Sequence, residues 1–249
     1  MLLRSANLLV RVLLAPQCAA CHDVLERPLL SPVCPACWRA IPAITPPWCA
    51  RCGDALASWR ASSPLCPRCR RRESGLLIAR SAGRYDGSLR LIVHAFKYDG
   101  RRALAGPLAA LMRTAGADLL AGADAVIPVP LHPWRALKRG FNQADDLARH
   151  LGPPVWRVLR RRRLGPPQAG LPAARRHSNV RSAFALNPLA LTARAARLRN
   201  RRVVLIDDVM TTGATLEACG RLLAEAGVRS VAALTAARAL AGAPHRRPP

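Results

Sequence analysis

The sequence has 249 residues, which is enough for one large domain or for a medium domain joined to a small one. It carries 39 Lys and Arg residues against 14 Asp and Glu, and the net charge of +25 favours polyanionic partners such as nucleic acid, anionic lipid or phosphorylated ligands. Because nearly every cation is arginine and alanine is abundant, coding bias explains the overall charge about as well as nucleic-acid binding does.

The N-terminal segment is apolar but too interrupted to cross a membrane. Arg4 and Arg11 break the run from Leu2 to Leu14, so no uncharged stretch here approaches the roughly 18 residues of a membrane span. The residues before Cys18 also make a poor cleavage site for a secretory signal. We therefore expect an amphipathic helix over residues 1–15, packed on the domain behind it, and a cytoplasmic protein without a membrane span.

Eight of the nine cysteines lie in a proline-rich region that could hardly fold on apolar burial alone. They form four C-x2-C pairs, separated by loops of 12, 11 and 13 residues: Cys18 and Cys21, Cys34 and Cys37, Cys49 and Cys52, Cys66 and Cys69. One such turn places two thiolates on the same side of a metal, and two turns complete the tetrahedral sulfur shell that Zn²⁺ prefers. Residues 16–72 are thus predicted to hold two structural zinc sites.

Two alternatives to zinc fit this region less well. A disulfide framework is disfavoured because nothing in the sequence indicates export, and iron–sulfur clusters usually have less evenly spaced ligands. The spacing leaves open whether the four pairs combine sequentially or in a cross-braced order.

Helix and strand signals alternate over residues 76–241. Apolar residues recur at helical spacing over 89–96 and 104–112, and a strand at 125–130 is followed by a loop at 131–138 and a helix at 139–151. Further expected elements are a strand at 155–159, a long functional loop or partly ordered lid at 160–184, a strand at 203–206, a helix ending at Gly227 and a strand at 228–235. The alternation predicts an α/β fold with a mostly parallel sheet and helices on both faces, before a basic, proline-rich tail at 242–249.

The most informative stretch joins the strand at 203–206 to the helix after it. Asp207 and Asp208 follow the strand, where ligands bind in open α/β sheets, and their carboxylates can accept hydrogen bonds from a sugar diol or hold a divalent ion. The following turn offers backbone N–H groups and three hydroxyls at a helix N-terminus, which suits a phosphate. This turn consists of Thr211, Thr212, Gly213, Ala214 and Thr215.

Other interpretations of this stretch are an ordinary buried strand with a threonine-capped helix, or a different phosphate-binding motif. Lys97 and Lys138 are the only lysines, and neither follows a glycine-rich turn as a nucleoside triphosphatase loop requires. No G-x-G-x-x-G follows any expected strand, so the sequence also argues against a Rossmann dehydrogenase.

Residues 203–215 resemble the signature of type I phosphoribosyltransferases, which bind 5-phosphoribosyl 1-diphosphate (PRPP). Together with the cysteine pairs, the whole chain resembles the ComF (ComFC/GntX-like) family, in which a double zinc ribbon is fused to a phosphoribosyltransferase domain. The remaining matching blocks are Phe96-Lys97-Tyr98-x-Gly100, Pro128-Val-Pro130, Arg139-Gly-Phe-Asn-Gln143, Gln168, Arg176-x-x-Asn179 and Phe184. One departure lies before Gln168, where the family resemblance leads us to expect a threonine.

The resemblance implies roles for single residues. It implies that Thr211 to Thr215 hold the 5′-phosphate, that Asp207 and Asp208 bind the ribose hydroxyls, and that Mg²⁺ bridges ribose and diphosphate. Arg135 is implied at the pyrophosphate, and Lys97 or the lid residues Arg175 and Arg176 would neutralise the leaving diphosphate. Surface charge is the alternative reading of each arginine, and helix capping is the alternative for Asn142 and Gln143.

The sequence is compatible with three functions. An enzyme would let a nitrogen nucleophile displace pyrophosphate from the anomeric carbon. A binding protein would sense PRPP or grip a nucleic-acid 5′-phosphate and sugar, with the ribbons, the arginine clusters and Trp38, Trp48 and Trp59 contacting single-stranded DNA or proteins of the DNA-uptake machinery. The family's link with competence favours a role in DNA uptake, whereas a purely stabilising or dimerising module would bind no ligand.

Overall fold

The computed structural model describes residues 7, 10, 12–56, 63–71, 77–162, 183–187 and 198–239 of the chain. Its helices are α2 (Pro35–Arg39), α3 (Pro67–Arg70), α4 (Gly87–Tyr98), the 3₁₀ helix η1 (Arg102–Leu104), α5 (Ala105–Ala115), α6 (Ala117–Ala121), α7 (Pro133–Arg139), α8 (Gln143–Ala148) and α11 (Ala214–Glu225). Its strands are β1 (Leu77–Arg84), β2 (Ala125–Pro128), β3 (Leu159–Arg161), β4 (Phe184–Leu186), β5 (Arg202–Met210) and β6 (Ser230–Arg238).

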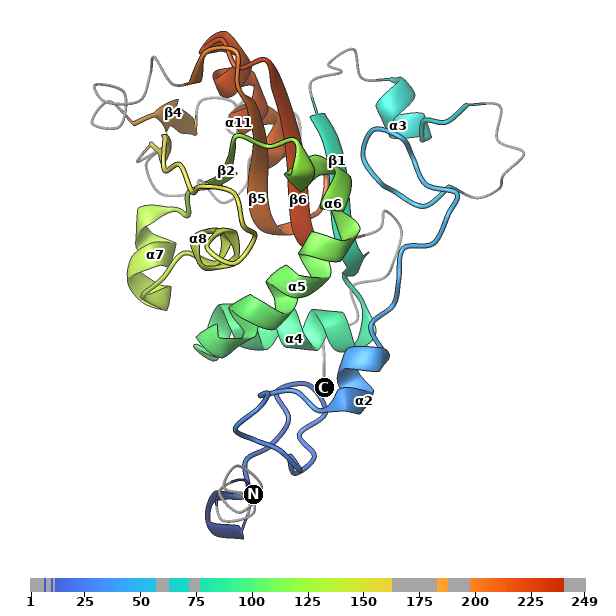
Figure 1. The fold of residues 1–249 in the computed structure, drawn as a ribbon, viewed down its shortest axis with the longest axis vertical. Helices are drawn as coiled ribbons and strands as arrows, with labels where there is room; N and C mark the ends of the chain where they lie inside the picture. The colour runs from blue at the N-terminus through green and yellow to red at the C-terminus, as the bar shows by residue number, and fades with distance from the viewer. Residues whose placement is uncertain are drawn as a thin grey trace, which may run out of the picture.

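The described part of the chain contains one parallel sheet of four strands, in the order β1-β6-β5-β2 (Figure 1). Val203 of β5 pairs with Val231 of β6 on one side and with Ala125 of β2 on the other. Strands β3 and β4 form a separate antiparallel pair, in which Arg161 lies opposite Phe184. The predicted α/β fold with a mostly parallel sheet is therefore confirmed.

Two hydrophobic cores cover the two faces of the sheet. Val204 and Ile206 of β5 pack with α4, α5 and α8, whereas Val203 and Leu205 pack with α11 and the β3–β4 pair. This alternation follows from the two-residue side-chain period of a strand. It explains why the run at 203–206 is entirely apolar, because each face of β5 lies under helices.

The two cysteine ribbons contact different parts of this domain. Cys18, Leu25 and Val33 of the first ribbon belong to the same core as α4, and α2 lies beside that helix (Figure 1). The second ribbon lies along β1, where the N–H of Ala79 donates to the carbonyl of Arg51 at 2.7 Å (Figure 1). Both ribbons therefore pack directly against the domain, the first through a shared core and the second along β1.

Several local predictions were wrong. Strand β1 was not expected. It consists largely of arginines and small residues, which give a weak strand signal, and the second ribbon covers its edge. The expected loop at 131–138 is largely helix α7, which begins with a His132 cap and Pro133, a favourable pair of helix-starting residues. The expected helix at 139–151 is shortened to α8, since Gly140 adopts a left-handed conformation that ends α7.

The strand expected at 155–159 is reduced to a bridge between Val155 and Val126, followed by β3. The ends of the segment expected to be a polar loop, Arg160 to Phe184, belong to β3 and β4, and Phe184 is buried. Most of the expected N-terminal helix, the middle of the expected lid and the tail at 242–249 lie outside the described residues. No helix in the described part is long and apolar enough to cross a membrane.

Candidate functional site

The candidate site begins in the last third of β5 and continues into the start of α11. Asp207 and Asp208 lie within the strand, which runs on to Met210. Gly213 is the N-cap of α11 with a φ of 77°, a left-handed conformation that favours glycine. The N-cap glycine makes no side-chain bond, and the contact described at the first amides is a long one of 3.4 Å from the N–H of Ala214 to Oγ1 of Thr212, which leaves this N-terminus open to an anion.

Asp208 is held by a close ion pair. Its Oδ1 lies 2.8 Å from Nζ of Lys97, and the two side chains are only 12% and 14% exposed. Lys97 comes from the last turn of α4, so two segments more than 100 residues apart meet at this carboxylate. The structure therefore places the predicted Lys97 on the acid pair itself, where its charge is already matched.

Asp207 has a different environment. Its Oδ1 accepts a hydrogen bond from the N–H of Asp208 at 2.8 Å. Burial and the neighbouring Asp208 carboxylate raise the pKa of Asp207 to about 7, against the opposing effects of that hydrogen bond, Lys97 and Arg161. Asp208 is thus paired with a lysine, whereas the environment of Asp207 brings its pKa to about 7, close to neutral pH.

Arg161 is the site residue that the sequence did not reveal. Its guanidinium lies 5.2 Å from the centroid of the Phe184 ring, and it acts electrostatically on Asp207. Burial and the positive charge of Arg135 lower the pKa of Arg161, and no hydrogen bond or ion pair joins it to another described residue. Within the arginine run at 160–163 nothing singles it out, since its position depends on pairing with Phe184, which comes 23 residues later.

The other predicted site residues are placed as follows. Arg135 lies on α7, is exposed, and is near enough to Arg161 for the two charges to interact. Thr211 and Thr212 are exposed, and Oγ1 of Thr212 accepts from the N–H of Ala214 at 3.4 Å. Arg175 and Arg176 lie outside the described residues.

The Arg139-Gly-Phe-Asn-Gln143 block holds the elements around the site in place. Asn142 caps α8 and donates through Nδ2 to the carbonyl of Val129, just after β2. Arg139 donates to Oε1 of Gln143 and lies 4.6 Å from the ring centroid of Tyr98 on α4. Helix capping, the alternative interpretation of Asn142, is therefore correct for this residue, and the block joins α7, α8 and α4.

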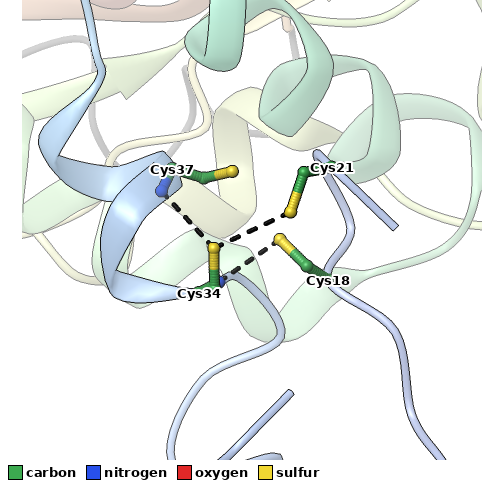
Figure 2. Close-up of side chains that lie close together, drawn as sticks. All are labelled: Cys18, Cys21, Cys34 and Cys37. Atoms are coloured by element: carbon green, nitrogen blue, oxygen red, sulfur yellow. Dashed lines mark hydrogen bonds between the residues drawn. The ribbon is translucent and has the colours of Figure 1, made fainter. Parts of the chain in front are cut away.

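The eight paired cysteines gather into two clusters, in sequential order. The first cluster consists of Cys18, Cys21, Cys34 and Cys37, and the second of Cys49, Cys52, Cys66 and Cys69, with the sulfurs of each within 4.8 Å of one another. Figure 2 shows the four side chains of the first cluster pointing toward one another from two turns.

Both clusters fit a tetrahedral zinc ion. Zn–S bonds of about 2.3 Å place neighbouring sulfurs about 3.8 Å apart. The Sγ atoms of Cys21 and Cys34 are 3.8 Å apart, and those of Cys52 and Cys66 are 3.7 Å apart. Each cluster therefore offers zinc four sulfur atoms, and the cysteines gather in the sequential rather than the cross-braced order.

Backbone N–H groups favour the thiolate of one cysteine in each cluster, whereas burial and neighbouring thiols raise the pKa of Cys37 and of Cys69. Burial alone would raise the pKa of the Cys18 thiol, but N–H groups of Cys21, Cys34 and Ala20 lower it to about 7. The same balance between burial and backbone donors brings the pKa of Cys49 to about 7. Each cluster thus contains a sulfur prepared to bind a metal at neutral pH.

Comparison with known proteins finds two families and a set of relatives. Residues 136–248 match the Phosphoribosyl transferase domain, and residues 9–72 match the Double zinc ribbon domain. The chain is 32% identical over 203 residues to Competence protein F of Haemophilus influenzae, which covers 78% of this chain and 85% of that protein. It is also 32% identical over 197 residues to DNA utilization protein YhgH of Salmonella typhi, covering 74% of this chain and 80% of the relative.

A shorter match is to adenine phosphoribosyltransferase of Nocardia farcinica. The two proteins are 37% identical over 117 residues, which cover 47% of this chain and 51% of the relative. With both domains in this order and more than 30% identity over most of Competence protein F, the chain belongs to the ComF family, in which a double zinc ribbon precedes a phosphoribosyltransferase domain.

Proposed function

We propose that residues 207–215 bind the ribose and 5′-phosphate of PRPP or of a closely related ribose phosphate. The observation that carries this proposal is the junction of two carboxylates with a helix N-terminus that begins at a glycine, on a single strand–turn–helix unit. The amides and hydroxyls of Thr211 to Thr215 suit a phosphate, whereas Asp207 and Asp208 suit the ribose diol. Opposite charge preferences side by side favour a sugar phosphate over a simple anion.

Mg²⁺ fits the same site. Carboxylates are ligands that Mg²⁺ accepts in small numbers together with substrate phosphates and water. Asp207 and Asp208 are the residues that would hold or orient it, and it would supply positive charge to the diphosphate. Lys97 keeps the Asp208 carboxylate oriented before the ligand arrives.

Positive side chains near the acid pair supply the charge that a leaving diphosphate requires. Arg161 and Arg135 are close enough to repel each other, and neither has a described carboxylate ion-pair partner. An anion between them would relieve that repulsion, and the planar guanidinium suits phosphate oxygens. We propose Arg161 and Arg135 as diphosphate ligands, joined by Arg175 and Arg176 from the segment between β3 and β4.

If the domain catalyses transfer, the reaction is displacement at the anomeric carbon. The bond from C1 to the diphosphate oxygen breaks, a bond from C1 to an acceptor nitrogen forms, and the electron pair leaves with pyrophosphate. The arginines stabilise that charge as it develops. Asp207, whose burial and neighbour raise its pKa to about 7, is suited to take the proton that the nitrogen releases.

The test is calorimetric titration of the full-length protein with PRPP in the presence of Mg²⁺. We expect binding in the wild type and a loss of at least about tenfold in Asp207→Asn/Asp208→Asn, while the matched carboxylate control Asp118→Asn on exposed α6 binds normally. Equal affinity in the folded double variant would reject the site. Pyrophosphate release across a panel of nucleobases and amines then separates an enzyme from a binding protein.

A second candidate function is binding of single-stranded DNA, which the names of the relatives favour. Trp134 is 69% exposed and lies on the same helix, α7, as Arg135 and Lys138. An exposed indole near two cations suits base stacking beside phosphate contacts. Trp38, by contrast, donates to Oγ of Ser31 within its ribbon. We expect oligonucleotide affinity to fall steeply with salt and to weaken several-fold in Trp134→Ala but not in Trp38→Phe; no binding at low salt would exclude this function.

A further inference from the structure

Arg238, the last residue of β6, is a buried cation in which two of the three guanidinium nitrogens have no described hydrogen-bond partner. Its side chain is 1% exposed and is the largest among the fully buried side chains described. Nη2 donates to Oδ2 of Asp54 at 3.2 Å and approaches Sγ of Cys52 at 3.6 Å. Nε and Nη1 have no hydrogen-bond partner among the described residues. A buried guanidinium in this condition requires a strong negative charge nearby.

The second cysteine cluster supplies that charge when it holds zinc. Four thiolates around one Zn²⁺ carry a net charge of −2, whereas four neutral thiols carry none. Asp54 adds a further negative charge and lies 3.7 Å from Nη2 of Arg68 at the edge of the cluster. A metal-loaded cluster therefore explains why an arginine is buried at the end of an otherwise apolar strand.

The first cysteine cluster is stabilised differently. The hydrogen bonds described for its sulfurs come from backbone N–H groups of Ala20, Cys34 and Cys37 or from a neighbouring thiol. Figure 2 shows this backbone arrangement around Cys34. Among the described contacts, an arginine side chain from the sheet therefore reaches a sulfur of the second cluster but not of the first.

Arg238 also lies beside the start of the candidate phosphate loop. Its position in β6 pairs with Met210 of β5, and the N–H of Ala239 donates to the carbonyl of Met210 at 2.9 Å. Met210 directly precedes Thr211. The side chain of Arg238 therefore reaches the second cluster while its backbone borders residues 211–215.

We propose that Arg238 is the buried counter-charge of the zinc–thiolate group in the second cluster and couples this group to the loop at 211–215. Zinc holds the guanidinium in place, and the guanidinium holds the end of β6 against β5. The effect on ligand affinity rests on the proposed function, whereas the effect on zinc retention does not. Arg238 is a positioning residue in this scheme, since nothing places it against a ligand.

The first test compares zinc release from Arg238→Met and from Arg80→Met in full-length protein loaded with Zn²⁺. Methionine keeps a long unbranched side chain but removes the charge. Arg80 is the matched control, because its described hydrogen bonds join the same ribbon to β1 through the carbonyls of Ala50 and Ala79. A Cys21→Ser variant, which removes an exposed ligand of the first cluster, identifies the kinetic phase of each site.

We expect Arg238→Met to speed zinc transfer from the second cluster to a chromogenic chelator by about tenfold or more, the usual scale for losing an outer partner of a metal ligand. Release from the first cluster, and from both clusters of Arg80→Met, should stay the same. Unchanged release from the second cluster in folded Arg238→Met would overturn the counter-charge. If that variant does not fold, Arg238→Lys replaces it, with faster release again expected because the forked guanidinium is lost.

The second test uses wild-type protein and hydrogen exchange. Removing zinc should speed exchange of the Ala239 amide, which donates to the carbonyl of Met210 next to the loop at 211–215, and equal protection of that amide with and without zinc would overturn the coupling. Affinity for PRPP with Mg²⁺ should weaken several-fold in Arg238→Met and stay the same in Arg80→Met. If the wild type binds no PRPP, the proposed function fails, while zinc release and exchange still decide the role of Arg238.

Discussion

The two carboxylates of the candidate site differ in how the fold compensates their charge. Asp208 has a buried lysine at 2.8 Å, whereas Asp207 has burial and a like charge against it. Paired acids in unequal environments are typical of functional sites, because the environment can bring one of them to exchange a proton near neutral pH. This asymmetry gives the site a pH dependence that can be measured without knowing the acceptor.

Replacing Asp207 should change the dependence of stability on pH. The folded pKa of about 7 lies above the ordinary value of 3.8, so the stability that Asp207 contributes is fully present below about pH 4 and is lost as pH rises toward 7. Asp207→Asn should therefore raise the free energy of unfolding at pH 8 by about 1–2 kcal/mol, less than the shift alone implies because the side chain keeps some contact with solvent.

Urea unfolding of both proteins at pH 5 and pH 8 checks this prediction. The stabilisation by Asp207→Asn should be clearly smaller at pH 5 than at pH 8. Destabilisation at both pH values would mean that ionised Asp207 is favoured by the fold, contrary to the environment described.

Lys97 should be costly to replace because it neutralises a buried carboxylate. Lys97→Met leaves Asp208 without its cation, and breaking a largely buried pair costs about 2–4 kcal/mol. The double variant Lys97→Met/Asp208→Asn removes both charges and should recover most of that loss. A double-mutant cycle from chemical unfolding measures the coupling, and strictly additive effects would show that the pair is energetically irrelevant.

At the level of elements, the turn between β5 and α11 depends on one glycine. Gly213 has a φ of 77°, so Gly213→Ala should cost about 1 kcal/mol and weaken phosphate binding by disturbing the amides that follow. Gly106 in helix α5 has room for a methyl group, with its nearest neighbour 4.0 Å from the added carbon, and Gly106→Ala should stabilise by about 0.5–1 kcal/mol.

Thermal unfolding and PRPP titration of these two variants check the sign of each effect. Gly213→Ala should lower both the melting temperature and the affinity, whereas Gly106→Ala should raise the first and leave the second unchanged. Equal behaviour of the two variants would mean that the left-handed turn has no special role.

The sequence predicted the elements whose signals are local. The apolar run at 203–206, the acids after it and the start of α11 are contiguous, and helical spacing located most of α4 and α5. Strand β1 was not predicted because one of its edges contacts the second ribbon. The β3–β4 pair was not predicted because its two strands are far apart in the sequence. Arg161 and Arg238 owe their surroundings to such distant contacts, so no local pattern marks them.

At the scale of the whole molecule, zinc should stabilise the phosphoribosyltransferase domain as well as the ribbons. Cys18, Leu25 and Val33 share a core with Leu89 and Phe96 of α4, so the first ribbon cannot unfold without exposing part of the domain. Zinc sites also contribute binding free energy that becomes folding free energy. The ribbons are in this sense structural parts of the domain that carries the site.

Metal analysis should find two zinc ions per chain, and the buried Cys219 outside the clusters should not contribute, so Cys219→Ser should also hold two. Chelation should lower the melting temperature of the domain by about 5 °C or more in scanning calorimetry. A domain transition that keeps its temperature after complete zinc removal would show that the ribbons are energetically independent.

A crystal structure of the protein with PRPP and Mg²⁺ would show directly where the sugar phosphate binds. We predict the 5′-phosphate on the amides of residues 211–215, the ribose hydroxyls on Asp207 and Asp208, and the diphosphate between Arg161 and Arg135. A phosphate bound elsewhere, with the acid pair still closed by Lys97 and free of sugar, would contradict this account.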